Sequence, residues 1–301
     1  MSVKRVKVIV NPYSGRWKAR AAVPAVEESL RKLGLAFDLV ATTAPDQGVE
    51  IARRAAVDGY DAVVAAGGDG AVSEVVNGLV MAAGESADTI AGPLGIIPLG
   101  SANDLADAFN LSYDVADACR CIQAGRSRVI DVGWVNGRYF GNNSAVGLEP
   151  MVTIRQSRMK RVKGTLRYVL AALLTILRHR DWHMTVEWDG GRFSGPTALV
   201  SVGNSPRTGG AFYMTPRAEL DDGRLDFVLG GGMSRLRLLR LLPTTFDGRH
   251  VDEPEITYGR TTRLTIACQP STPVQADGEL FDRPATRIEY RLLPGKLRVI
   301  V

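Results

Sequence analysis

Three short loops in the first third of the chain combine glycine with serine, asparagine or aspartate, and each follows an apolar run. They are Asn11-Pro12-Tyr13-Ser14-Gly15, Gly67-Gly68-Asp69-Gly70 and Pro98–Asp104, the last with Ser101 and Asn103 near its tip. Glycine lets backbone N–H groups approach a phosphate closely, and a helix that begins at such a loop adds a favourable dipole. The three loops together therefore predict one composite nucleotide site.

The carboxylate of Asp69 lies in the middle of the second loop, where it would repel bare phosphate. Its presence makes sense if a divalent cation accompanies the phosphates, as magnesium does with a nucleotide. The alternative is an ordinary turn between a strand and a helix, with Asp69 as a helix cap. The recurrence of such loops favours the nucleotide site.

The elements that must position these loops alternate between strand and helix. Strands are predicted near residues 5–10, 36–41, 61–66 and 94–98, and helices near 17–33, 46–57, 71–83, 103–109 and 113–124. This alternation predicts a doubly wound, mostly parallel α/β domain. Because ligands of open sheets bind at the carboxyl ends of the strands, we expect the three loops to meet there.

The pattern changes after Gly125. Residues 128–144, with Asn136-Gly137 between two apolar runs, predict a hairpin, and short alternating segments then predict a β-rich second domain. One helix is expected within it, near residues 166–178, with leucines at helical spacing. That helix either packs on the second domain or faces lipid as an amphipathic helix. The active site is expected in a cleft between the two domains.

In their order and spacing the three loops resemble those of the soluble bacterial diacylglycerol kinases and their relatives, the sphingosine and ceramide kinases. That family carries an N-P-x-S-G loop, a G-G-D-G loop followed by E-x-x-N-G, and a P-x-G-T-x-N-D loop. This chain matches all three loops, and Leu220–Leu225 and Asp277–Glu279 resemble the family's L-x-D-G-x-L and D-G-E segments. It departs from the family at Ala71, where threonine is frequent, and at Ser101, where threonine is usual.

The resemblance implies a fold of two domains. These are an ATP-binding α/β catalytic domain at residues 1–126, joined by the C-terminal tail 284–301, and a β-sandwich-like lipid-substrate domain at 127–283. It implies ATP- and Mg²⁺-dependent transfer of the γ-phosphate to a lipid hydroxyl, with diacylglycerol giving phosphatidate as the favoured reaction. Two alternatives stay open: a kinase of a soluble substrate such as NAD, and a non-catalytic regulator that binds lipid or nucleotide.

The same resemblance assigns roles to residues. Those expected to bind ATP are Asn11, Pro12, Tyr13, Ser14, Gly15, Thr42, Gly67, Gly68, Asp69, Gly70, Ala71, Val72, Ser73, Glu74, Ser101 and Asn103. Glu279 is favoured as the proton acceptor of the lipid hydroxyl, with Asp277 close behind, and Asp69 is the third catalytic residue. If their segment is a strand, Asp277 and Glu279 lie on one face of it; the alternative is a D-G hairpin turn.

A structural magnesium ion is implied at the L-x-D-G-x-L segment. By resemblance, its ligands are the carboxylate of Asp222 and the backbone carbonyls of Glu219 and Arg224, and oxygen ligands suit a hard cation. An ordinary Asp-Gly turn is the alternative, and Asp221 could replace Asp222. His179 and His183 have the spacing of a zinc pair, but no third ligand is evident, so a zinc site is not expected.

The charge and composition of the chain limit the kinds of partner that we expect. The net charge is +5, and the stretch Arg155–Arg167 holds six basic residues and no acid. This stretch is either a solvated surface or a transient contact with anionic membrane lipid, at about 1 kcal/mol per charge. No motif indicates nucleic acid.

Three cysteines, no signal peptide and no long apolar run predict a cytoplasmic protein, with a peripheral position at the inner membrane face left open. The resemblance also leaves a homodimer open.

Overall fold

The computed structural model of the chain describes residues 3–159 and 165–301. It divides into two compact units, which are Met1–Val132 with Leu293–Val301, and Gly133–Leu292. Each unit has its own apolar core.

The first unit is built on a parallel sheet in the order β2-β1-β3-β4-β15. The strands are β1 (Arg5–Val10), β2 (Ala36–Ala41), β3 (Ala62–Gly67), β4 (Ala91–Pro98) and the end of β15 (Ala285–Ile300). Every residue of β3 is buried, because a central strand of a parallel sheet is covered on both faces. The parallel pairing brings the carboxyl ends of β1, β3 and β4 to one edge of the sheet.

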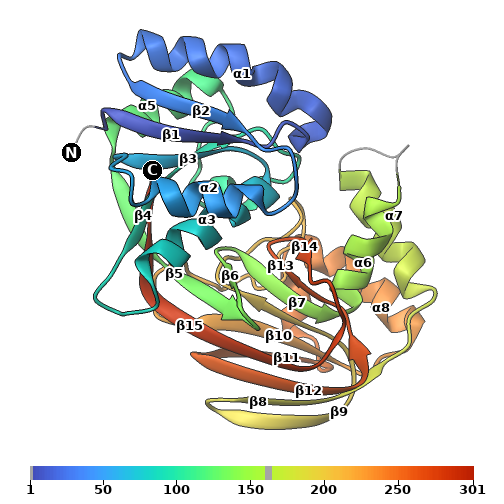
Figure 1. Cartoon of the computed structure of the whole chain (residues 1–301). Coiled ribbons are helices and arrows are strands. Elements are labelled where there is room, and N and C mark those ends of the chain that lie inside the picture. The colour runs from blue at the N-terminus through green and yellow to red at the C-terminus, as the bar shows by residue number, and fades with distance from the viewer. Residues whose placement is uncertain (1–2, 160–164) are drawn as a thin grey trace. The chain divides into compact units, whose positions relative to one another are not determined.

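Helices cover both faces of this sheet (Figure 1). On one face lie α1 (Ser14–Lys32) and α5 (Val115–Ala124), whose apolar side chains share a core cluster with β1 and β3. On the other lie α2 (Gln47–Ala55) and α3 (Asp69–Ala83), and a short helix, α4 (Asp104–Ala108), follows β4. The predicted α/β architecture of this unit is confirmed.

The second unit is an antiparallel sheet that carries the order β14-β13-β7-β9-β8-β12-β15, with β10 between β9 and β11. The strands are β5 (Ser127–Val135), β6 (Arg138–Phe140), β7 (Asn143–Gly147), β8 (Trp182–Trp188), β9 (Gly191–Gly203), β10 (Leu225–Gly231), β11 (Ile256–Thr261), β12 (Arg263–Thr272), β13 (Val274–Ala276) and β14 (Glu279–Leu280). The predicted hairpin is present as β5–β6, with both turn residues at positive φ. Residues 143–147, however, form the separate strand β7.

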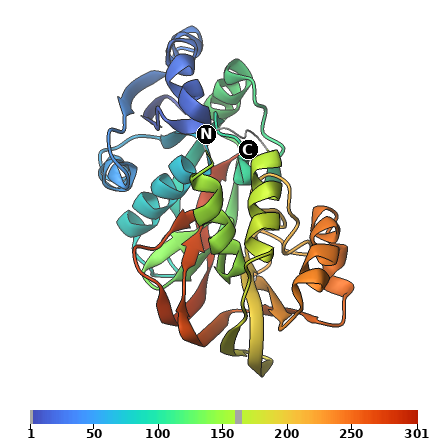
Figure 2. The same ribbon diagram turned by 90° about the vertical axis from the view of Figure 1, so that its right-hand side faces the viewer.

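The expectation of a single helix in the second unit is wrong. The predicted helix is α7 (Thr165–Ile176), which lies beside α6 (Leu148–Ser157) in Figure 2. A third helix, α8 (Arg235–Leu241), has an Arg-Leu alternation that is typical of a strand, but Leu238 and Leu241 are buried and Ser234 caps its first turn. None of the helices within the described residues is long and apolar enough to cross a membrane.

Candidate active site

The three polar loops of the first unit are bonded to one another. The Oγ of Ser14, in the first loop, accepts a hydrogen bond from the N–H of Gly68 at 3.1 Å. The N–H of Leu99, in the third loop, donates to the carbonyl of Gly67 at 2.7 Å. The structure therefore brings the predicted nucleotide loops together at the carboxyl edge of the sheet.

Asp69 links the second loop to the third. Its two carboxylate oxygens accept the N–H groups of Asn103 at 2.9 Å and Asp104 at 2.6 Å. The carboxylate thus satisfies backbone donors at the start of α4, where negative charge is favourable. Asp69, which begins α3, therefore caps α4.

Glycine is required where these loops cross. A Cβ on Gly100 would lie 2.3 Å from the Cα of Gly68, and a Cβ on Gly15 would lie 2.5 Å from the carbonyl oxygen of Leu99. Real Cβ atoms do not approach other atoms so closely. The glycines therefore serve the contacts between the loops as well as any approach of phosphate.

The backbone after the first loop is strained. Arg16 and Trp17 have φ angles of 59° and 74°, in a left-handed region that bulky residues rarely adopt. The rings of Tyr13 and Trp17 pair with their centroids 4.5 Å apart and stay about half exposed. Strain of this kind concentrates at functional sites. The sequence alone did not point to Trp17, because nothing in its local pattern predicts the left-handed turn.

Other residues predicted to bind ATP make contacts within the first unit. Thr42 is buried at the end of β2, and its N–H donates to the carbonyl of Val10 at 2.9 Å. The carboxylate of Glu74 accepts the N–H groups of Asp46 at 3.2 Å and Gly48 at 2.7 Å, at the start of α2. Glu74 therefore holds α2 against α3, and its role toward the nucleotide stays a prediction.

In the second unit, Asp277 and Gly278 form the two-residue turn between β13 and β14. Their φ angles are 48° and 81°, and Ala276 pairs with Glu279 across the hairpin. Positive φ at both central residues is the geometry that favours an Asp-Gly turn. The expectation that Asp277 and Glu279 share one face of a strand is therefore wrong, because Asp277 leaves the strand.

The carboxylates of Asp277 and Glu279 have different surroundings. Asp277 is buried and accepts the N–H groups of Gly141, Asn142 and Asn143, each at 3.0 Å. Glu279 is exposed at the start of β14. Asp277 thus anchors the hairpin to the segment before β7, while Glu279 is open to solvent.

Comparisons with known proteins place the chain in a family. Residues 5–135 match the diacylglycerol kinase catalytic domain, and residues 142–301 match the YegS C-terminal NAD kinase beta sandwich-like domain. The chain is 30% identical over 279 residues to the diacylglycerol kinase of Bacillus subtilis (strain 168), with 92% of this chain and 90% of the relative covered. This chain belongs to the diacylglycerol kinase family. At the level of that family it is an ATP-dependent lipid kinase, and a soluble substrate or a non-catalytic role is not favoured.

Further relatives agree with this assignment. The chain is 28% identical over 277 residues to the diacylglycerol kinase of Staphylococcus aureus (strain MRSA252), with 92% of this chain and 86% of the relative covered. A crystal structure of a diacylglycerol kinase from Bacillus anthracis str. Sterne superposes with a TM-score of 0.74 at 20% identity and covers 100% of this chain and 97% of that one. A further structure from that organism superposes with a TM-score of 0.80 at 23% sequence identity, and the match covers 100% of this chain and 96% of that one. At these identities the two structures show a shared fold.

Asp222, the expected carboxylate ligand of a structural magnesium ion, has other partners in this structure. One of its oxygens accepts the N–H of Arg224 at 3.0 Å, and the other contacts the guanidinium of Arg260. The same guanidinium lies 3.6 Å from the carboxylate of Asp226, which is fully buried and whose pKa is raised by that burial. These residues do not fit a resident magnesium ion, because Arg260 already supplies the positive charge between the two carboxylates.

Within residues 3–159 and 165–301, no group of three or more His, Cys, Asp or Glu side chains could hold a metal ion. His179 pairs with Asp181 at 2.8 Å, and the absence of a zinc site at His179 and His183 stays a prediction.

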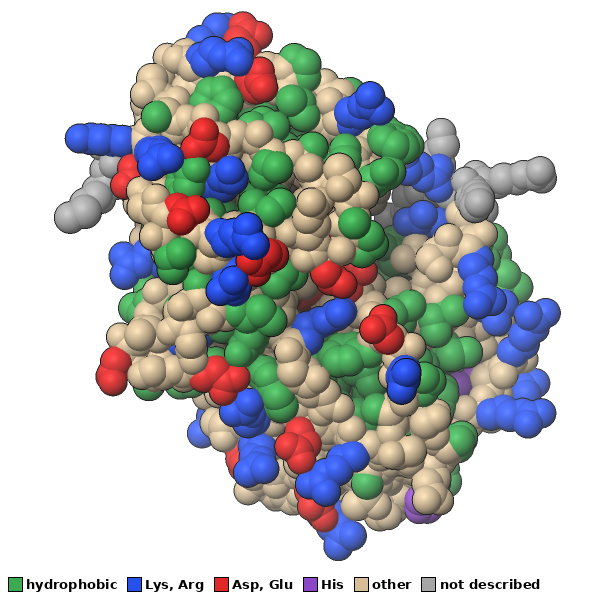
Figure 3. Space-filling view, viewed as in Figure 1, with side chains coloured by type: hydrophobic (Ala, Val, Ile, Leu, Met, Phe, Trp, Pro, Cys, Tyr) green, Lys and Arg blue, Asp and Glu red, His purple; other side chains and the backbone are tan. Residues whose placement is uncertain are grey.

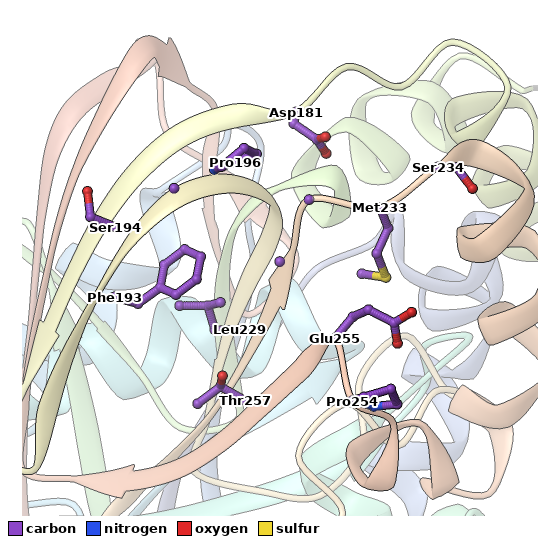
Figure 4. Close-up of a pocket in the computed structure, with 13 residues that line it drawn as sticks. Asp181, Phe193, Ser194, Pro196, Leu229, Met233, Ser234, Pro254, Glu255 and Thr257 are labelled. Atoms are coloured by element: carbon purple, nitrogen blue, oxygen red, sulfur yellow. The ribbon is translucent and has the colours of Figure 1, made fainter.

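A pocket of about 720 Å³ opens in the second unit between β9, β10 and the start of α8 (Figure 4). Phe193, Leu229 and Met233 form its apolar part, and Asp181 and Glu255 lie at its polar part. Both acids already have partners, since His179 binds Asp181 and Arg237 binds Glu255. No residue predicted for catalysis, ATP or metal is among those that line the pocket.

Proposed function

We propose that this protein is a diacylglycerol kinase, which transfers the γ-phosphate of magnesium-bound ATP to the free hydroxyl of diacylglycerol and releases phosphatidate and ADP. The observation that carries the proposal is the 30% identity to an enzyme named diacylglycerol kinase over 92% of this chain. The bonded loops of the first unit and the Asp277–Glu279 hairpin of the second supply residues for both halves of this reaction.

The first unit is proposed to bind ATP. Phosphoryl transfer depends mainly on holding the phosphates in position and on neutralising their negative charge. The Ser14–Gly68 hydrogen bond and the contact between Gly68 and Gly100 hold the loops in one arrangement at the start of α3. Backbone N–H groups at the start of a helix of 15 residues, such as α3, are suited to phosphate.

The second unit is proposed to bind the lipid alcohol, with Glu279 as the proton acceptor. Glu279 is exposed, whereas the oxygens of Asp277 already accept three backbone N–H groups. A general base in the right position contributes roughly 10²–10⁴-fold to the rate. Asp277 is proposed to hold the turn from which Glu279 projects.

Peripheral contact with a membrane is proposed for the α7–α8 side of the second unit. Leu177 and Leu236 are 51% and 59% exposed there. Lys and Arg side chains gather over α7 and α8 in Figure 3. The exposed arginines there are Arg178 and Arg180, which follow α7, and Arg235 and Arg240 of α8. Apolar and basic groups together suit an anionic bilayer. Lys160, Arg161 and Lys163 of the predicted basic stretch lie outside the described residues, and a homodimer stays a prediction.

The test is phosphate transfer from labelled ATP with magnesium to mixed micelles that contain diacylglycerol, a sphingoid base or ceramide, with NAD as a soluble acceptor. Wild type is compared with Asp69→Asn and Glu279→Gln, and Glu187→Gln is the control because Glu187 is an exposed residue of β8. We expect label in diacylglycerol, lost in the first two variants and kept in the control. Label in NAD alone, in another lipid, or in no acceptor would overturn the proposal.

A further inference from the structure

Glu149 lies in the first turn of α6, next to the hairpin that carries Glu279. Its Oε1 accepts two hydrogen bonds from side-chain amides, one from Asn143 at 2.9 Å and one from Gln275 at 3.1 Å. Asn143 and Gln275 are each only 2% exposed, so water does not compete for these amides. Glu149 is therefore the common acceptor of two buried amide groups.

The same two residues hold the Asp277–Gly278 turn. The Oε1 of Gln275 accepts the N–H of Gly278 at 2.6 Å. The backbone of Asn143 donates its N–H to the carboxylate of Asp277 at 3.0 Å and accepts the N–H of Asp277 at 2.7 Å. Asn143 and Gln275 thus connect Glu149 to both residues of the turn.

The orientation of Gln275 depends on the acceptor at Glu149. A side-chain amide has donors on one side and an acceptor on the other, and a half-turn exchanges them. With the carboxyl group of Glu149 on one side, the NH₂ group of Gln275 faces Glu149 and its oxygen faces the N–H of Gly278. Reversing the amide would place its NH₂ group against the N–H of Gly278, and it would leave a buried donor without an acceptor, which is unfavourable.

We propose that Glu149 is a positioning residue of the kinase, which fixes the amides of Gln275 and Asn143 and through them the turn that aims Glu279. The inference rests on the proposed role of Glu279 as the base. A carboxylate that must meet a substrate hydroxyl within hydrogen-bond reach needs such support, because a misplacement of about 1 Å can cost about 10²-fold in rate.

The second oxygen of Glu149 supports this reading. Glu149 Oε2 and the hydroxyl of Ser201 on β9 are both buried. Burial raises the pKa of Glu149 to about 7, against the lowering effect of Ser201 as a hydrogen-bonding partner. A proton on Oε2 leaves Oε1 free to accept from both amides. Other titratable groups of this region are Tyr290, whose pKa is raised by burial and further by Glu149, and Asp277 and Glu279 of the hairpin.

The first arm of the test is steady-state lipid phosphorylation by Glu149→Leu and Glu149→Gln. The glutamine oxygen can still accept from both amides, whereas leucine cannot. We expect Glu149→Leu to lose about 10²-fold in kcat, with KM for ATP unchanged, and Glu149→Gln to restore most of kcat. The loss of kcat in Gln275→Leu should not add to that of Glu149→Leu when both changes are combined, because both act through the amide of Gln275. Glu187→Leu, at an exposed position of β8, is the matched control.

The second arm is hydrogen exchange of the segment 274–281, which needs no turnover. We expect faster exchange in Glu149→Leu and wild-type protection in Glu149→Gln. A folded Glu149→Leu protein with wild-type kcat and wild-type protection would overturn the inference. So would additive losses, or a Glu149→Gln variant as impaired as the leucine variant. If wild type phosphorylates no lipid, the proposed function fails, and the exchange arm alone still decides whether Glu149 holds the turn.

Discussion

The backbones of Gly68 and Gly100 touch, so that a Cβ placed on Gly100 would lie 2.3 Å from the Cα of Gly68. The two residues are more than thirty positions apart in the chain. They meet because β3 and β4 are parallel neighbours, with Gly67 opposite Pro98 at the ends of the strands. The contact fixes the second and third loops as one surface.

Gly100→Ala should therefore separate these loops. We expect ATP affinity to fall at least tenfold, which corresponds to about 1.4 kcal/mol, because the methyl group cannot be accommodated without moving the backbone at Gly68. Isothermal titration with magnesium-bound ATP measures this. Gly190→Ala is the control, since its Cβ would meet no atom closer than 3.4 Å. Unchanged affinity in Gly100→Ala would show that the loop contact is not needed for nucleotide binding.

Asp69→Asn should weaken both stability and activity. The amide can accept only at its oxygen, so one N–H of Asn103 or Asp104 would face an NH₂ group. We expect a loss of about 1–3 kcal/mol in the free energy of unfolding, measured by urea denaturation, together with loss of transfer. Asp58→Asn, at an exposed site, is the control. A stable but inactive variant would instead point to a role of the charge toward magnesium-bound ATP.

Stability should depend on pH through Glu149. Folding raises its pKa from the ordinary 4.5 to about 7, so the folded state binds the proton more tightly than the unfolded chain. The stabilising contribution is complete below about pH 4.5 and is lost as the pH rises through 7, by at most about 3 kcal/mol. Urea denaturation of wild type and Glu149→Gln from pH 5 to 8 isolates this contribution. A constant difference between the two across that range would contradict it.

Metal removal should leave the Asp222 turn intact. Arg260 contacts Asp222 and lies 3.6 Å from Asp226, so a chelator has no cation to remove there. We expect the same melting temperature for wild type in EDTA and in magnesium without nucleotide. Arg260→Met should be destabilised, by about 3–5 kcal/mol at most, because two carboxylates would lose their common cation. Arg192→Met, which removes one partner of an exposed surface pair with Glu187, is the control. A lower melting temperature of the wild type in EDTA would contradict this prediction and would indicate a resident metal ion.

The sequence by itself determined the first unit and the identity of its loops. The apolar runs of β1, β3 and β4 and the glycine-bearing loops after them are local signals, and the strand–helix alternation leaves few ways to arrange a parallel sheet. The order and spacing of the motifs likewise indicated the family. These features can be recognised because each depends on residues that are close together in the chain.

Only the tertiary structure decided how the second unit uses its charged residues. Asp277 could be a strand residue or a turn residue, and the pairing of β13 with β14 chose the turn. Arg260 reaches Asp222 because β11 pairs with β10, and Glu149 meets Gln275 because β13 pairs with β7 beside α6. Helix α8 exists because Leu238 and Leu241 are buried against neighbours far away in sequence. Long-range pairing and packing decided between local alternatives at each of these places, and no local pattern in the sequence encodes such contacts.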